Sequence, residues 1–130
     1  MPRKTAVRSD WQNNPLPTRR CILSLERCFS AAEMDRIRLG VIPEEMEEKW
    51  FIFFEDGRLF LHRSWTGFCV YVVEFAERDG QHVISKVEAN REPRQYSEKD
   101  SEFDARLLSH LIDVLLLDRW SEFPKRKDEE

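Results

Sequence analysis

The chain has few of the residues that build phosphate-binding loops, disulfide frameworks or metal sites. Its 130 residues include only four glycines and three cysteines. It contains no glycine-rich phosphate loop, no Cys-x-x-Cys pair, and no histidines at metal-ligand spacing. We therefore expect no metal and no cofactor. An odd number of cysteines without a pattern is typical of reduced thiols in a cytoplasmic protein.

The chain also lacks an apolar run long enough to span a bilayer, and no apolar stretch follows its basic first ten residues. We expect neither a membrane span nor a secretory signal, and a cytoplasmic location. The formal net charge of −4 argues against a nucleic-acid groove, which would need a basic stripe, and is compatible with a basic protein partner. With 41% hydrophobic and 35% charged residues, the composition is that of one globular domain.

Local signals divide the chain into three parts. Residues 1–20 hold five basic residues, one acid and three prolines, and predict a flexible basic arm. Residues 21–120 are expected to form a single α+β domain, and residues 121–130 a charged tail. Ser30 and Glu33 have the spacing of a capping box before a short helix that ends at Gly40. Apolar residues at helical spacing, Val114 among them, predict a long helix over residues 101–120.

Short apolar runs separated by turn residues predict strands between residues 49 and 90. Together with a possible edge strand at residues 21–27, they predict a four- to five-stranded antiparallel meander sheet. The short N-terminal helix and the long C-terminal helix would pack on it, giving an α+β fold. Asp56-Gly57 is the strongest hairpin signal, because a type I′ turn needs positive φ at both central positions. A two-residue turn there places Trp50 opposite Arg63.

Two further turns are predicted at Thr66-Gly67 and Asp79-Gly80. A slip of one residue at Thr66-Gly67 would exchange the two faces of every later strand. With tight turns at both places, the expected pairs are His62 with Tyr71, Phe60 with Val73, Phe75 with Ile84, Val73 with Lys86 and Tyr71 with Glu88.

Residues opposite each other lie on the same face of a sheet, so this register predicts two different faces. The first is aliphatic and suits helix packing, with Ile52, Leu61, Val72, Val83 and Val87. The second is aromatic and needs a cover, either a helix or another subunit of a homo-oligomer. Its aromatic residues are Phe51, Phe53, Phe60 and Phe75. Its other end is polar, and gathers Lys49, His62, Ser64, Cys69, Tyr71, Glu88 and Asn90.

We expect a binding site at this polar end, beside the turn after residue 63. A guanidinium of Arg63 over the Trp50 indole would gain about 0.5–2 kcal/mol. It would either hold the sheet edge or present a planar fork to a phosphate or carboxylate. Trp65 would stack on a base or a partner's side chain, or else plug one end of the core. The candidate ligand-binding residues are Trp50, His62, Arg63, Ser64, Trp65, Thr66, Gly67, Cys69 and Tyr71.

His62 offers a catalytic alternative, as a general base toward Ser64 or Cys69. The only acid positioned to orient it is Glu88, across two turns. The structural alternative is a histidine that is hydrogen-bonded within a half-buried face.

Residues 42–73 contain IPEEMEEKWFIFFEDGRLFLHRSWTGFC. This segment resembles a small, functionally uncharacterised bacterial domain family with the pattern KWFI-x-x-ED-x-x-L-x-x-HRSWTG-x-C, found alone or beside ADP-ribose-processing domains. The resemblance implies that HRSWTG, residues 62–67, is the family's signature. It implies no activity.

Three hypotheses follow. The first is a cytoplasmic binding or accessory module that holds a small anionic, nucleotide-like ligand or a protein partner at residues 62–71, without catalysis. The second is a small hydrolase or transferase that uses His62 with Ser64 or Cys69. The third is an acidic inhibitor or immunity-type protein that binds a basic partner through residues 44–48.

Overall fold

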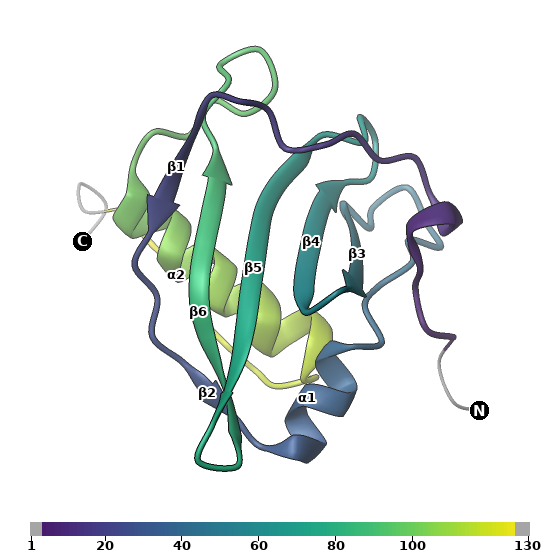
Figure 1. Cartoon of the computed structure of the whole chain (residues 1–130). Helices are drawn as coiled ribbons and strands as arrows, with labels where there is room; N and C mark the ends of the chain where they lie inside the picture. The colour runs from purple at the N-terminus through teal and green to yellow at the C-terminus, as the bar shows by residue number, and fades with distance from the viewer. Residues whose placement is uncertain (1–3, 127–130) are drawn as a thin grey trace.

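Six strands form one antiparallel sheet in the computed structural model, which describes residues 4–126 (Figure 1). The sheet order is β1-β6-β5-β4-β3, and β2 also pairs with β6. The strands are β1 (Arg20–Leu23), β2 (Cys28–Phe29), β3 (Trp50–Glu55), β4 (Arg58–Arg63), β5 (Cys69–Arg78) and β6 (Gln81–Asn90). The α+β class is as expected.

The sheet has more strands than the four or five expected. β6 is ten residues long, and two short strands share its outer edge. β1 pairs with residues 87–90 of β6, and β2 with residues 82–83. The sheet is therefore a meander of β3 to β6 whose far edge is completed by two strands from earlier in the chain.

Local signals placed the helices well. The capping box is present: the Ser30 hydroxyl accepts a hydrogen bond from the Glu33 backbone N–H, and the Glu33 carboxylate accepts one from the Ser30 N–H. It starts α1 (Ala31–Ile37), and Gly40 follows with φ +67°. In the N-terminal arm, residues 8–10 form one 3-10 turn, η1 (Arg8–Asp10).

The C-terminal helix is shorter than predicted. α2 (Ser101–Leu111) is capped by Asp100 and continues as one π-helical segment, η2 (Ile112–Leu116), before Asp118 takes φ +53°. A π turn holds more residues than an α turn, so it rotates the later side chains relative to the α-helical periodicity. This explains why Val114, predicted to face inward, is exposed, while Leu116 is fully buried.

The first hairpin has the predicted register throughout, from Glu55 opposite Arg58 to Trp50 opposite Arg63. Asp56 and Gly57 both have positive φ, at 52° and 77°, as a type I′ turn requires. The Asp79-Gly80 turn has the same form. These turns fix their register because the constraint lies within the turn itself.

The predicted register between β4 and β5 is wrong, by one residue over residues 58–61 and by two at His62. His62 lies opposite Cys69 and Leu61 opposite Tyr71, with an irregularity between the two pairs. The connection is longer than a two-residue turn: the Arg63 N–H donates to the Phe68 carbonyl at 2.9 Å, across residues 64–67. The slip moves Tyr71 to the face that α2 covers, and moves Val72 to the opposite face.

A second irregularity, between Glu74 and Phe75, changes the register of β5 and β6. Phe75 does pair with Ile84, as predicted. Beyond this point Val73 pairs with Val87 and not Lys86, and Tyr71 pairs with Ala89 and not Glu88. Phe75 also packs in the helix-side core and not in the aromatic group of the other face.

The main core lies between the sheet and the helices, with α2 behind the sheet in Figure 1. It contains residues from all six strands and from both helices, including Met34, Ile52, Leu61, Tyr71 and Leu108. Among residues 4–126, no helix has the length and apolar character needed to cross a membrane.

The opposite face of β3 and β4 is covered by the N-terminal segment. Ala6 is fully buried against Phe51 and Phe53, and its N–H donates to the Leu39 carbonyl at 2.7 Å. The Arg8 guanidinium lies 4.9 Å from the Phe53 ring centroid. The cover expected from a helix or a second subunit is thus supplied by residues 6–14 of the same chain. In Figure 1 the N-terminal segment lies beside β3, and the chain after η1 runs along the top of the sheet to β1.

Candidate anion-binding site

The connection at residues 64–67 is hydrogen-bonded to two segments that are distant from it in the sequence, residues 46–48 and residues 11–14, and we call this contact region the junction. The Ser64 hydroxyl donates to the Glu48 carbonyl at 2.8 Å, and the Trp65 indole N–H to the Met46 carbonyl at 2.9 Å. On the other side, the Trp11 indole N–H donates to the Ser64 carbonyl at 2.7 Å. Ser64 and Trp65, within the HRSWTG segment of residues 62–67, therefore hold this junction together.

Gly67 belongs to the same junction. Its carbonyl accepts a hydrogen bond from the Asn14 N–H at 2.8 Å, and its φ is +78°. A Cβ at this position would lie 3.2 Å from side-chain atoms of Gln12 and Asn14. Both the conformation and the close approach of the arm favour glycine here.

His62 is buried under the arm, not open to a substrate. Its side of the sheet is aromatic: the imidazole stacks on Phe53 at 5.5 Å between centroids and lies 6.0 Å from Phe51. Among the described residues, Nδ1 has no hydrogen-bond partner. Loss of hydration lowers the pKa of His62 to about 4, despite an opposing interaction with the Asn14 backbone. The ring is therefore neutral at pH 7.

The two nucleophiles considered for a hydrolase are also enclosed. Ser64 is buried, with its hydroxyl engaged by Glu48. Cys69 is buried, and burial raises the pKa of its thiol to about 12, which disfavours the reactive thiolate. His62 and Cys69 lie on the same face and are paired across β4 and β5. No described hydrogen bond joins the imidazole to the Ser64 hydroxyl or to the Cys69 thiol, so His62 is not placed to take a proton from either nucleophile. Glu88, the acid considered as an orienting group, instead pairs with Arg20 at 3.1 Å.

Tyr71 lies on the other side of the sheet, in a buried polar network. Its hydroxyl and that of Tyr96 both donate to Oδ1 of Asp104, and Arg91 pairs with Oδ2 at 2.6 Å. Asp104 is fully buried. Burial is the first cause that raises the pKa of both tyrosines, with the Asp104 carboxylate adding to it. The network fixes the Tyr96 ring, and with it residues 95–98, against α2.

Arg63 projects from the same face, at the end of β4. Its guanidinium carbon lies 4.8 Å from the Trp50 ring centroid, and Trp50 in turn stacks on Tyr71 at 6.3 Å. The indole ring thus packs against the Arg63 side chain and restricts the orientation of its guanidinium group. Within residues 4–126, the guanidinium has neither a hydrogen bond nor an ion pair with another side chain.

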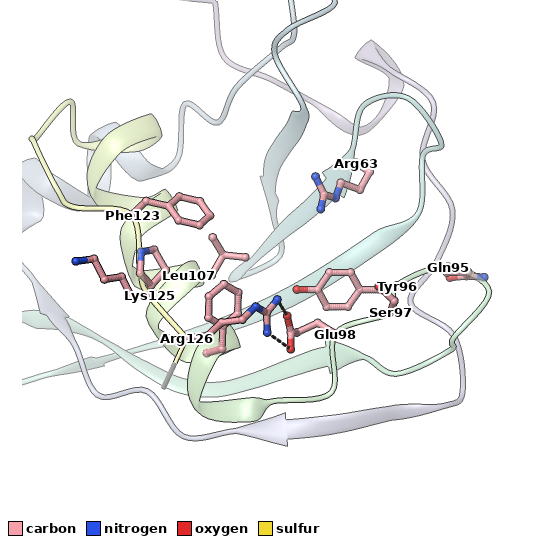
Figure 2. A pocket seen from close by; sticks show the side chains of 11 residues that line it. Arg63, Gln95, Tyr96, Ser97, Glu98, Leu107, Phe123, Lys125 and Arg126 are labelled. Carbon is pink, nitrogen blue, oxygen red and sulfur yellow. Dashed lines mark hydrogen bonds and ion pairs between the residues drawn. The ribbon is translucent and has the colours of Figure 1, made fainter. Parts of the chain in front are cut away.

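Two pockets meet at Arg63. The larger has a volume of about 520 Å³, and the smaller about 340 Å³. Arg63 and Gln95 line both. The smaller pocket is completed by Lys49, Trp65 and Thr66. The larger one is formed by residues 95–98, by Phe103 and Leu107 of α2, and by residues 123–126. Figure 2 shows Phe123 and Leu107 facing Arg63 and Tyr96 across it.

The charges around these pockets leave an excess of positive charge. Glu98 is the acid of the larger pocket, and it is neutralised by Arg126, whose hydrogen bonds lower the pKa of Glu98. Lys49, Arg63 and Lys125 have no acidic partner in the part of the chain that is described. An anion at Arg63 would supply the missing counter-charge. No cluster of three or more histidine, cysteine or acidic side chains suited to a metal ion occurs among the described residues.

The structure divides the nine predicted site residues into two groups. Arg63, Trp65 and Thr66 line a pocket, and Trp50 supports Arg63 from beneath. His62, Ser64, Gly67 and Cys69 are buried, and Tyr71 lies in the core network. Lys49 had been placed at the polar end, but the remaining pocket residues had no local signal: Gln95, Tyr96, Ser97, Glu98, Phe103, Leu107, Phe123, Pro124, Lys125 and Arg126.

The acidic run at residues 44–48 folds back on itself at the surface. The Glu48 carboxylate accepts hydrogen bonds from the backbone N–H groups of Glu44 and Glu45, which closes the loop on itself. Glu44, Glu45, Glu47 and Glu48 are all exposed.

The chain matches no family model, and no curated protein or solved structure is significantly similar to it.

Proposed function

We propose that the protein is a cytoplasmic, non-catalytic binding module that holds an anionic, nucleotide-like ligand at the pocket formed by Lys49, Arg63, Trp65, Thr66 and Gln95. Arg63 carries the proposal, because it is a half-buried arginine with no carboxylate partner among residues 4–126, at the point where two pockets meet. An arginine fork matches the planar geometry of a phosphate or carboxylate.

The surrounding side chains support this assignment. Trp50 orients the guanidinium before any ligand arrives, which reduces the entropy lost on binding. Trp65 is 67% exposed although its indole N–H is fixed on Met46, so the face of its ring is open for stacking on a base. Lys49 adds a second positive charge to the pocket.

The enclosed state of His62, Ser64 and Cys69 is the reason to propose binding without catalysis. None of the three lines the larger or the smaller pocket. A nucleophile and its base must both reach the substrate, and these side chains lie on the arm-covered side or within the junction.

A ligand screen by thermal unfolding tests the proposal. The compounds are AMP, ADP, pyrophosphate and ADP-ribose, the last because of the family that residues 42–73 resemble. A ligand at a hundred times its Kd should add about 2.7 kcal/mol to the free energy of unfolding. We expect Arg63→Gln to weaken binding about 10- to 100-fold, since hydrogen bonds to charged groups contribute about 1.5–3 kcal/mol.

Arg58→Gln is the matched control. Arg58 lies at the other end of β4 and also covers an aromatic ring, that of Phe60 at 5.3 Å, but it lines neither pocket. Arg63→Lys should retain part of the affinity, because it keeps the charge and loses the fork. Binding that is equal in wild type and Arg63→Gln would contradict the proposal, and so would a screen in which no anion stabilises the wild type.

A further inference from the structure

The larger pocket differs in chemistry from the smaller one. Its walls are the rings of Tyr96, Phe103 and Phe123 together with Leu107, and its cations are Arg63 at one side and Lys125 at the other. The Arg126 guanidinium lies 4.2 Å from the Phe103 ring centroid, where its ion pair with Glu98 holds it. The pocket therefore combines aromatic surface with two positive charges that no acid of residues 4–126 compensates.

The walls are fixed before a ligand enters. The Tyr96 hydroxyl is bound to buried Asp104, and residues 123–126 are held to residues 95–98 by the Arg126–Glu98 pair at 2.5 Å. Phe123 is 61% exposed and packs edge-on against His110 at 5.3 Å. An exposed aromatic ring held at the mouth of a rigid pocket is suited to stack on a flat group.

The two pockets adjoin each other, since Arg63 and Gln95 line both. Each has an exposed aromatic ring in its lining, Trp65 in one and Phe123 in the other. Each also has its own lysine, Lys49 or Lys125. Arg63 is thus common to two pockets, and each pocket has aromatic side chains of its own. Both volumes fall in the usual range of small-molecule sites.

We infer that the ligand is two-ended: a diphosphate bridge lies at Arg63, and a ring-bearing group at each end occupies one pocket. This inference rests on the proposed function, since it uses the same Arg63 anchor. The two negative charges of a diphosphate diester lie at Arg63, beside the smaller pocket that Lys49 lines. One ring stacks on Trp65 and the other enters between Tyr96 and Phe123.

Calorimetric titration with three probes tests this arrangement. Pyrophosphate supplies the anion alone, AMP an anion with one ring, and diadenosine diphosphate a bridging anion with two rings. We expect affinity to rise in that order. Stacking of the second ring should make the two-ringed probe bind about fivefold to a hundredfold more tightly than AMP.

Three variants assign that gain to the two pockets. Phe123→Ala and Trp65→Ala should each bring the two-ringed probe close to the affinity of AMP, because one ring loses its stacking partner. Trp120→Ala should retain the full gain, since Trp120 is 88% exposed, belongs to the same C-terminal segment and lines neither pocket. All three positions are exposed, and a thermal unfolding curve verifies that each variant is folded.

The outcomes separate this inference from the proposed function. If AMP binds in an Arg63-dependent way but the two-ringed probe gains nothing, the two-ended ligand is wrong and the anion site stands. A gain that survives Phe123→Ala has the same meaning. If no probe binds, both proposals fail.

Discussion

At the scale of single residues, burial decides what His62 does. The imidazole is 1% exposed, stacks on Phe53, and lies beneath a segment that contains Arg8. Its charged form would lose hydration without gaining an acid, and the nearby Arg8 charge disfavours it further. His62 is therefore a neutral core residue, and its protonation destabilises the folded state.

Stability should consequently depend on pH through His62. The unfolded imidazole takes up a proton near pH 6.5, whereas the folded one does so only near pH 4. The unfolded state therefore binds more protons between these values, and the free energy of unfolding falls as the pH decreases from 6.5 to 4. The loss from this group amounts to at most about 3 kcal/mol.

Chemical unfolding in urea between pH 4.5 and 7.5 measures this slope. His62→Gln should flatten it, because glutamine does not titrate, and NMR titration of the wild-type ring should give a midpoint near pH 4. Equal slopes in the two proteins, or a ring that titrates in its ordinary range, would show that His62 is not desolvated.

At the scale of elements, Gly40 is the joint between α1 and the sheet. Its φ is +67°. The next residue, Val41, forms an isolated β-bridge with Ile52 on the outer edge of β3. A Cβ on Gly40 would lie 2.1 Å from the Ile52 carbonyl oxygen, and 3.0 Å from the Cβ of Ala6. Helix, edge strand and arm therefore converge where only a glycine fits.

Gly40→Ala should destabilise the protein severely. We expect a loss of at least about 3 kcal/mol, because the left-handed conformation costs about 1–2 kcal/mol and the clash with backbone adds to it. Gly80→Ala is the matched control: its φ is +80°, and an added Cβ meets nothing within 4 Å. Denaturant unfolding measures the loss of free energy of unfolding in both variants. The difference between the two losses gives the part that is due to the clash of the added Cβ with the Ile52 backbone. Similar losses in the two would show that the α1–sheet joint can relax.

At the scale of the whole molecule, the N-terminal arm completes the core. It covers the ring cluster of Phe51, Phe53 and Phe60, and its Arg8 pairs with Glu55 at 2.6 Å. Without this cover the sheet would present an aromatic face to solvent, a surface of the kind that promotes association. The irregular segment of residues 6–14 thus replaces the helix or second subunit that such a face would otherwise need.

Detaching the arm should expose that face. Ala6→Asp puts a carboxylate against buried aromatic rings, and we expect a loss of about 2 kcal/mol or more. Binding of the dye ANS should rise, and size-exclusion chromatography should show association. Thr5→Asp adds the same charge at an exposed neighbouring position and should change neither stability nor dye binding. An Ala6→Asp protein that unfolds like Thr5→Asp would mean that the arm contributes little to the core.

The sequence by itself determined those features whose constraints lie within a few neighbouring residues. Asp56-Gly57 and Asp79-Gly80 specify turns through their own φ angles, so the hairpin that places Trp50 opposite Arg63 could be predicted to the residue. The capping box of α1 was equally local. The placement of Arg63 over the Trp50 indole follows from that register alone.

Only the tertiary structure decided the rest, because it depends on packing between distant segments. The irregularities after Leu61 and Glu74 have no local signal. The first places Tyr71 in the helix-side core, where it can reach Asp104, and the second changes its partner in β6 from Glu88 to Ala89. The larger pocket joins β4 to residues 95–98, to α2 and to residues 123–126, segments that come together only when the sheet and helix pack. Turn chemistry acts over two residues, whereas a pocket depends on the position of every element around it.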